Sequence, residues 1–164
     1  MAFGCPYYVE LVVYHWSLSA AEISSLLPTL KPYRTSSIGD VKKGTLPGGK
    51  PRLATNSVWM MRLHEEDVLH GDRVGVNSFL ESQLHVLAKY KDAFQELDND
   101  GDVNIEVHLK LAESHQTAFV IKPDVMRSMA ESGISLDVEI SYIPGQSEDV
   151  PSGGEHPAGD TAPD

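Results

Sequence analysis

Two segments of the chain carry an apolar residue at every second position. They are residues 103–111 (VNIEVHLKL) and residues 134–142 (ISLDVEISY). A period of two is typical of a β-strand with one buried and one solvated face. A sheet built from such strands is antiparallel or mixed, and it needs helices over its apolar face only. The alternation therefore predicts a two-layer α+β sandwich.

A short helix is predicted just after the first apolar segment of the chain. Ser19 and Glu22 have the spacing of a capping box, in which the serine side chain and the glutamate side chain bond each other's backbone N–H groups. Leu18 and Ile23 have the spacing of the hydrophobic staple around such a cap, and Pro28 ends the helix.

The same capping pattern at Ser78 and Glu81 predicts the start of a long helix, which the sequence DNDGD ends. Apolar residues follow its buried side at helical spacing: Leu80, Leu84, Leu87, Phe94 and Leu97. A third, short helix is expected between Pro123, which suits a first helical position, and Gly133, which suits a C-cap.

The other segments complete the predicted order β-α-β-α-β-β-α-β. Residues 7–16 and 58–63 are expected to be strands, and residues 116–121 an antiparallel partner of residues 103–111. We therefore expect a mixed, mostly antiparallel sheet of about five strands, with helices on one face, in a single domain over residues 1–143.

Charge is unevenly distributed over the 164 residues, whose formal net charge is -11. Residues 144–164 contain five acidic residues, no Lys or Arg, and many Pro and Gly, so we expect a disordered acidic tail. The overall charge argues against nucleic acid as the main partner and against a membrane surface. With one cysteine, Cys5, and no apolar run that could span a bilayer, a cytoplasmic location is expected.

Residues 31–56, here called the basic segment, contain six Lys or Arg and one Asp and are rich in Gly and Pro. A long loop of this kind in a compact domain is often functional. We expect it to bind a protein partner or a small anionic ligand; the alternatives are a mobile solvated loop and a loop that neutralises the protein's own acidic surface. The candidate binding residues are Lys31, Arg34, Lys42, Lys43, Lys50, Arg52 and Trp59.

Two motifs resemble cofactor sites without completing them. Residues 44–50 (GTLPGGK) match the core of a phosphate-binding loop, but Pro51 follows where that mechanism needs a Ser or Thr and a helix. Residues 96–107 resemble a calcium loop, but Val107 stands where the closing carboxylate belongs. We interpret the first as a flexible loop and the second as a helix end followed by a turn.

Residues 64–72 (HEEDVLHGD) gather histidines and carboxylates, and we interpret them as a solvated acidic loop. We predict no cofactor and no metal; His64, Asp67 and His70 would be the first residues to test if a metal did bind.

The polar faces of the two alternating strands carry Glu106, His108, Asp137 and Glu139. If these strands are neighbours, a carboxylate pair with a histidine would suffice for general acid–base chemistry. Because alternating polar residues are ordinary on a solvated sheet face, we interpret them as such a face.

The predicted elements follow a distinctive order: SAAEI on a short helix, a basic Gly-rich segment before Trp59, a long helix, and the segments VNIEVHLKL and GISLDVEI. In this order the chain resembles a family of small bacterial domains of unknown function, over roughly residues 7–143. The resemblance implies an architecture and argues against an enzyme, but it implies no catalytic residue. We expect a non-catalytic binding module. A toxin-immunity protein, an enzyme with a site under the basic segment, and a homo-oligomer are the alternatives.

Overall fold

The computed structural model describes residues 5–42, 51–69, 73–112 and 120–143. It contains one five-stranded sheet in the order β2-β3-β1-β4-β5. The strands are β1 Cys5–His15, β2 Arg34–Ser36, β3 Ser57–Leu69, β4 Gly101–Ala112 and β5 Ser135–Ile143. The helices are α1 Ala20–Leu26, α2 Arg73–Leu87, α3 Lys91–Asp98 and α4 Pro123–Glu131, with a 3-10 turn at Ala88–Tyr90.

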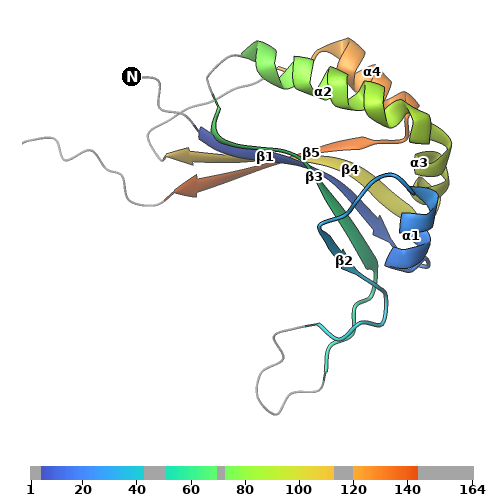
Figure 1. The fold of residues 1–164 in the computed structure, drawn as a ribbon. Helices are drawn as coiled ribbons and strands as arrows, with labels where there is room; N and C mark the ends of the chain where they lie inside the picture. Colours follow the sequence, from blue (N-terminus) through green and yellow to red (C-terminus); the bar gives the residue numbers. More distant parts are fainter. Residues whose placement is uncertain (1–4, 43–50, 70–72, 113–119, 144–164) are drawn as a thin grey trace, which may run out of the picture.

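The sheet is mixed, and β1 is its central strand. β1 pairs antiparallel with β3 and β4, β2 pairs antiparallel with β3, and β4 pairs parallel with β5. The helices of the described residues all lie on one face of the sheet, and none of them covers the other face (Figure 1). This confirms the predicted α+β fold.

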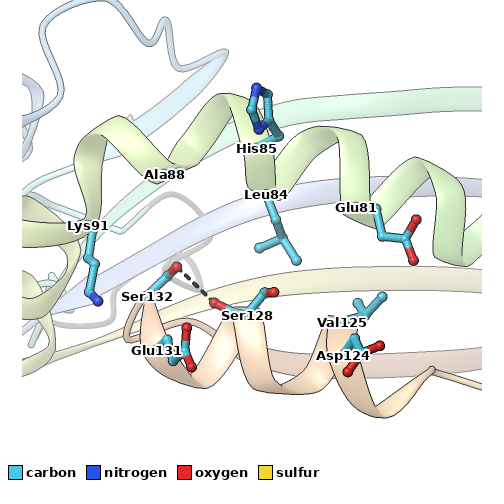
Figure 2. Close-up of a pocket in the computed structure, with 10 residues that line it drawn as sticks. All are labelled: Glu81, Leu84, His85, Ala88, Lys91, Asp124, Val125, Ser128, Glu131 and Ser132. Carbon is cyan, nitrogen blue, oxygen red and sulfur yellow. Dashed lines mark hydrogen bonds between the residues drawn. The ribbon is translucent and has the colours of Figure 1, made fainter.

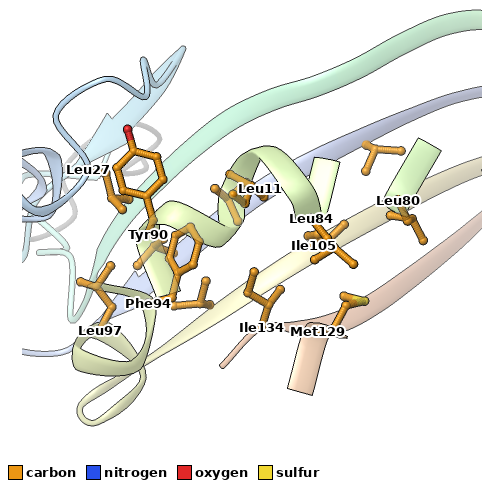
Figure 3. Packing of buried hydrophobic residues seen from close by; sticks show 14 of the residues in the cluster. Leu11, Leu27, Leu80, Leu84, Tyr90, Phe94, Leu97, Ile105, Met129 and Ile134 are labelled. Carbon is orange, nitrogen blue, oxygen red and sulfur yellow. The ribbon is translucent and has the colours of Figure 1, made fainter. Parts of the chain in front are cut away.

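The core lies between the sheet and the helices. Alternate residues of β1 and β4 face it, including Leu11 and Ile105, and residues of every helix meet them (Figure 3). The predicted apolar stripe is confirmed, since each of its members is buried: Leu80, Leu84, Leu87, Phe94 and Leu97. None of the helices among the described residues is long and apolar enough to cross a membrane.

The cap of α1 has the predicted geometry. The Glu22 N–H donates to Ser19 Oγ at 3.3 Å, and the Ser19 N–H donates to Glu22 Oε2 at 2.7 Å. The predicted helix end near residue 98 is also present, because α3 ends at Asp98 and β4 begins at Gly101.

Two predicted boundaries are wrong. Residues 64–69 belong to β3 instead of a loop, and the long helix begins at Arg73, so Ser78 lies inside α2 and caps nothing. The helix is also interrupted by the 3-10 turn, which buries Tyr90 and brings its hydroxyl into a hydrogen bond with Thr29.

The basic segment contains more structure than the sequence predicts. Its residues 34–36 form β2, and beyond them the chain continues as an antiparallel extension with a bridge between Val41 and Leu53. The Lys42 N–H donates to Arg52 O and the Ala54 N–H donates to Asp40 O, both at 2.8 Å. This extension projects away from the sheet (Figure 1).

Several predicted features lie outside the described residues. They are the whole GTLPGGK motif at residues 44–50, most of the predicted strand at residues 116–121, and the acidic tail from residue 144. Of the predicted strand, Val120 and Ile121 are described, and neither is in a strand.

Candidate functional site

The face of the sheet without helices carries a group of polar and aromatic side chains centred on Glu10. Although Glu10 lies on this uncovered face, it is only 2% exposed, because its neighbours enclose it. We call this group the polar-face cluster, and its members are Tyr8, Glu10, Tyr14, Tyr33, Arg62, Glu106, His108 and Glu139.

Strand register explains why these residues meet. Glu10 is the central member of one row across three strands, paired with Arg62 of β3 on one side and Glu106 of β4 on the other. Paired residues of neighbouring strands project to the same face. His108 lies two residues along β4 and is paired with Glu139 of β5, so it joins the same face.

The two carboxylate oxygens of Glu10 have different partners. Oε1 accepts a hydrogen bond from the Tyr33 hydroxyl and forms an ion pair with Arg62 Nε at 3.0 Å. Oε2 faces His108 Nε2 at 3.5 Å. The guanidinium of Arg62 also lies over the rings of Tyr8 and Tyr33, with centroid distances of 4.2 and 5.1 Å.

His108 is fixed on both sides of its ring. Its Nδ1 lies 2.7 Å from Glu139 Oε2, and its Nε2 lies 3.3 Å from Glu106 Oε2. The ring stacks on Tyr8 with a centroid distance of 4.2 Å and an interplanar angle of 21°. The imidazole therefore has one orientation, with Nε2 directed at two carboxylates.

Burial shifts the acid–base behaviour of Tyr14 and Glu106. The Tyr14 hydroxyl donates to Glu106 Oε1 at 3.2 Å, and burial, reinforced by the charge of Glu106, raises the pKa of Tyr14 to about 12. Burial also raises the pKa of Glu106, and the carboxylates of Asp137 and Glu10 add to the rise, whereas Tyr14 and His108 oppose it.

Two of the sequence-predicted binding residues line a cavity at the β2 end of the same sheet. The cavity has a volume of about 680 Å³ and lies between β2, the start of β3 and the base of the extension. Arg34 and Lys42 contribute cations to its wall, Asp40 contributes a carboxylate, and the other polar lining residues are Thr35, Ser36 and Asn56.

The other sequence-predicted residues are elsewhere. Lys31 and Arg52 are exposed and do not line this cavity, while Lys43 and Lys50 lie outside the described residues. Trp59 has no exposed surface, because its side chain packs in the core on the helical side of the sheet, where its indole N–H donates to Ser24 Oγ at 3.1 Å. Its side chain therefore cannot contribute to a binding surface.

A second cavity, of about 430 Å³, lies between α2 and α4. Leu84 points from α2 toward α4, and charged residues such as Glu81, Lys91 and Asp124 surround the opening (Figure 2). None of the sequence-predicted binding residues lines this cavity, and the polar-face cluster lies on the other side of the sheet.

The four polar residues predicted on residues 103–111 and 134–142 are adjacent, as the acid–base hypothesis required. β4 and β5 are neighbours, and Glu106 pairs with Asp137 while His108 pairs with Glu139. The histidine thus has a carboxylate on each side. These residues lie on the face of the sheet that no described helix covers.

A family model described as a domain of unknown function (DUF4279) matches residues 6–142. The chain belongs to this family. The DUF4279 match confirms the resemblance found in the sequence and covers every member of the polar-face cluster. Comparisons with curated proteins and with solved structures found no match to this chain.

Sequence reasoning missed the centre of the cluster. Glu10 stood on the polar side of its predicted strand, but nothing in the sequence placed that strand between β3 and β4. A glutamate within the run VELVV is the one signal that could have drawn attention to it, because a carboxylate in an apolar strand needs partners.

Proposed function

We propose that the domain is a non-catalytic, cytoplasmic binding module that holds a small anionic ligand in the cavity at the base of the basic extension. The observation that carries the proposal is the convergence of Arg34 and Lys42 on one cavity of about 680 Å³. Small-molecule sites occupy about 300–1,000 Å³, so the cavity has a suitable size.

The chemistry of the lining fits an anion. Guanidinium and ammonium groups form the strongest hydrogen bonds with carboxylates and phosphates, and the hydroxyls of Thr35 and Ser36 and the amide of Asn56 add neutral donors. Asp40 opposes an anion, but its Oδ2 already accepts a hydrogen bond from the Ser37 N–H at 2.6 Å. The local balance of formal charge on the lining is therefore positive, in a protein of net charge -11.

The base of the extension is anchored to the domain, which favours a preformed site. The Ile38 N–H donates to the buried Ser57 Oγ at 2.9 Å, and the Gly39 N–H donates to Ala54 O at 2.9 Å. Ser37 Oγ accepts from the Ala20 N–H at the start of α1, at 3.1 Å. A lining fixed by such contacts loses less conformational entropy on binding.

A nuclear magnetic resonance titration with inorganic phosphate and with citrate tests the proposal. We expect saturable shifts of the backbone amides of Arg34, Thr35, Ser36 and Lys42. The double variant Arg34→Gln/Lys42→Gln is expected to weaken binding by about tenfold or more, because each lost charged hydrogen bond contributes about 1.5–3 kcal/mol.

The matched control is Lys89→Gln/Lys91→Gln, which removes the same charge from the helical layer, away from this cavity. Equal weakening by both double variants would show only a general effect of net charge and would contradict the proposal. So would the absence of saturable shifts with both anions. The toxin-immunity and enzyme alternatives stay predictions, since no specific contact favours them.

A further inference from the structure

Three side-chain atoms that commonly bind metal ions converge within the polar-face cluster. They are Glu10 Oε2, Glu106 Oε2 and His108 Nε2, one donor atom from each residue. The donor atoms of these three residues lie within 4.8 Å of one another. Glu10 comes from β1 and the other two come from β4, so backbone pairing in the middle of the sheet holds all three.

The spacing of these atoms matches a tetrahedral metal site. His108 Nε2 lies 3.3 Å from Glu106 Oε2 and 3.5 Å from Glu10 Oε2. Zinc binds imidazole nitrogen and carboxylate oxygen at about 2.0–2.2 Å, which puts two ligands of a tetrahedron about 3.3–3.6 Å apart. By contrast, hydrogen bonds between charged nitrogen and oxygen atoms are shorter, at about 2.7–2.9 Å.

The electrostatics of His108 also call for a cation at this point. Its Nδ1 lies 2.7 Å from Glu139 Oε2, so a neutral imidazole that donates through Nδ1 presents the lone pair of Nε2 to the two carboxylates. That Nε2 atom is buried and has no hydrogen-bond partner in the part of the chain that the structure describes. Two carboxylates that face the same nitrogen repel one another unless a positive charge lies between them, and a bound metal ion or a proton on Nε2 supplies that charge.

Each of the three residues is oriented by a further contact through its other polar atom. Tyr33 and Arg62 hold the second oxygen of Glu10, and Tyr14 holds the second oxygen of Glu106. Glu139 holds Nδ1 of His108. Metal-binding histidines and carboxylates are usually supported by such outer contacts, and the carboxylate–histidine–metal arrangement is a recurrent form of them.

We propose that Glu10, Glu106 and His108 form a binding site for a divalent transition metal ion of the zinc type. An imidazole with two carboxylates favours such an ion over magnesium or calcium, which prefer oxygen ligands alone. Three protein ligands leave a fourth position for water or another ligand. The ion can reach the site through His108 and Glu106, whose side chains are each 13% exposed on a face that no described helix covers. Glu139 acts as a positioning residue for the imidazole.

Isothermal titration calorimetry tests the proposal: the full chain is first treated with a chelator and is then titrated with Zn²⁺. We expect one high-affinity site in the wild type and its loss in His108→Gln. Glu106→Gln, which is nearly isosteric, is expected to weaken the site, and Glu139→Gln to weaken it by about tenfold to a hundredfold. Because the chain contains seven histidines, the matched control is His85→Gln on the exposed side of α2, which is expected to bind as the wild type does.

A second measurement guards against variants that fail to fold. In the wild type, Zn²⁺ is expected to shift the imidazole nuclear magnetic resonance signals of His108 before those of any other histidine. The proposal is overturned if His108→Gln binds Zn²⁺ as tightly as the wild type, if no high-affinity site exists, or if another histidine responds first. None of these results depends on Arg34 or Lys42. The metal-site proposal and the anion-cavity proposal can therefore be refuted independently of each other.

Discussion

Gly101, the first residue of β4, leaves no room for a side chain beside the carbonyl oxygen of Tyr14 in β1. A side-chain carbon on residue 101 would come within 2.4 Å of that oxygen and within 2.7 Å of the Leu97 carbonyl oxygen. Both are backbone atoms, so neither can move aside as a flexible side chain would. The connection between α3 and β4 therefore requires glycine at position 101.

We accordingly expect Gly101→Ala to lower the free energy of unfolding by about 3 kcal/mol through this overlap. Urea denaturation followed by circular dichroism measures the change. Gly39→Ala serves as the control, because a side-chain carbon there meets nothing within 4 Å and only the positive φ of 86° opposes it. Its expected cost is about 1 kcal/mol, and a Gly101 variant no less stable than this one would contradict the steric argument.

Ser19→Ala is expected to lower stability by about 1 kcal/mol at neutral pH, since it removes the N-cap of α1. The backbone N–H and the hydroxyl of Ser19 lower the pKa of Glu22. A lowered pKa stabilises the folded state above the unfolded pKa, and this contribution is lost as the pH falls through the folded value.

The variant keeps the N–H and loses the hydroxyl, so the pKa of Glu22 should rise toward its ordinary value. Consequently the stability difference between the wild type and Ser19→Ala should shrink in acid, which a series of urea denaturations at falling pH measures. Ser25→Ala, in the same helix, removes a hydroxyl that donates to Ala21 O at 3.0 Å and should leave that pH dependence unchanged. A constant difference across the pH range would count against the capping box.

Trp59→Phe is expected to lower the free energy of unfolding by about 2 kcal/mol, because it leaves a cavity in the core and removes the hydrogen bond to Ser24. Phosphate binding should be unaffected, because the buried Trp59 does not line the cavity proposed to hold the anion. The control is Trp16→Phe, whose side chain is 48% exposed, with an expected change below about 0.5 kcal/mol. If the folded Trp59→Phe variant bound phosphate more weakly, Trp59 would contribute to the binding site, contrary to this prediction.

Asn77→Ala is expected to lower stability by about 2–3 kcal/mol, because the buried amide joins α2 to the segment that precedes α4. Its Nδ2 donates to Val120 O at 2.6 Å, and its Oδ1 accepts from the Lys122 N–H at 2.8 Å. Hydrogen exchange provides the specific readout, since the amide of Lys122 should lose protection.

Ser82→Ala, on the exposed side of the same helix, should leave the exchange of Lys122 as it is in the wild type. If Lys122 keeps its protection in Asn77→Ala, the joint between α2 and α4 does not depend on this side chain.

Local patterns accounted for most of the fold. Ser19 and Glu22 form their capping box because its partners are three residues apart, and the alternating strands follow from a period that any local window reveals. Ser78 and Glu81 show the same spacing without a cap, since Ser78 follows five residues that are already helical. β2 escaped notice because Arg34, Thr35 and Ser36 have no apolar alternation and pair only at the edge of the sheet.

The candidate site could be predicted from the sequence only in part, for a different reason. Glu106, His108 and Glu139 could be placed on polar strand faces, but the position of Glu10 beside them depends on which strands are neighbours. Strand order is decided by contacts between distant segments, which periodicity does not encode. The hydrogen bond from the Tyr33 hydroxyl, in the basic segment, to Glu10 likewise depends on tertiary packing.

The central position of β1 has a consequence for the order in which the molecule can assemble. Tyr8 pairs with Glu65 on one side and with His108 on the other, so β1 gains its second partner only after a long stretch of chain beyond β3 has been synthesised. Pairings that span so much of the chain slow folding and expose unpaired strand edges to aggregation in the meantime. During synthesis β4 can complete its pairing with the second edge of β1 only after Leu109 has emerged, and until then that edge is open to pairing with other chains.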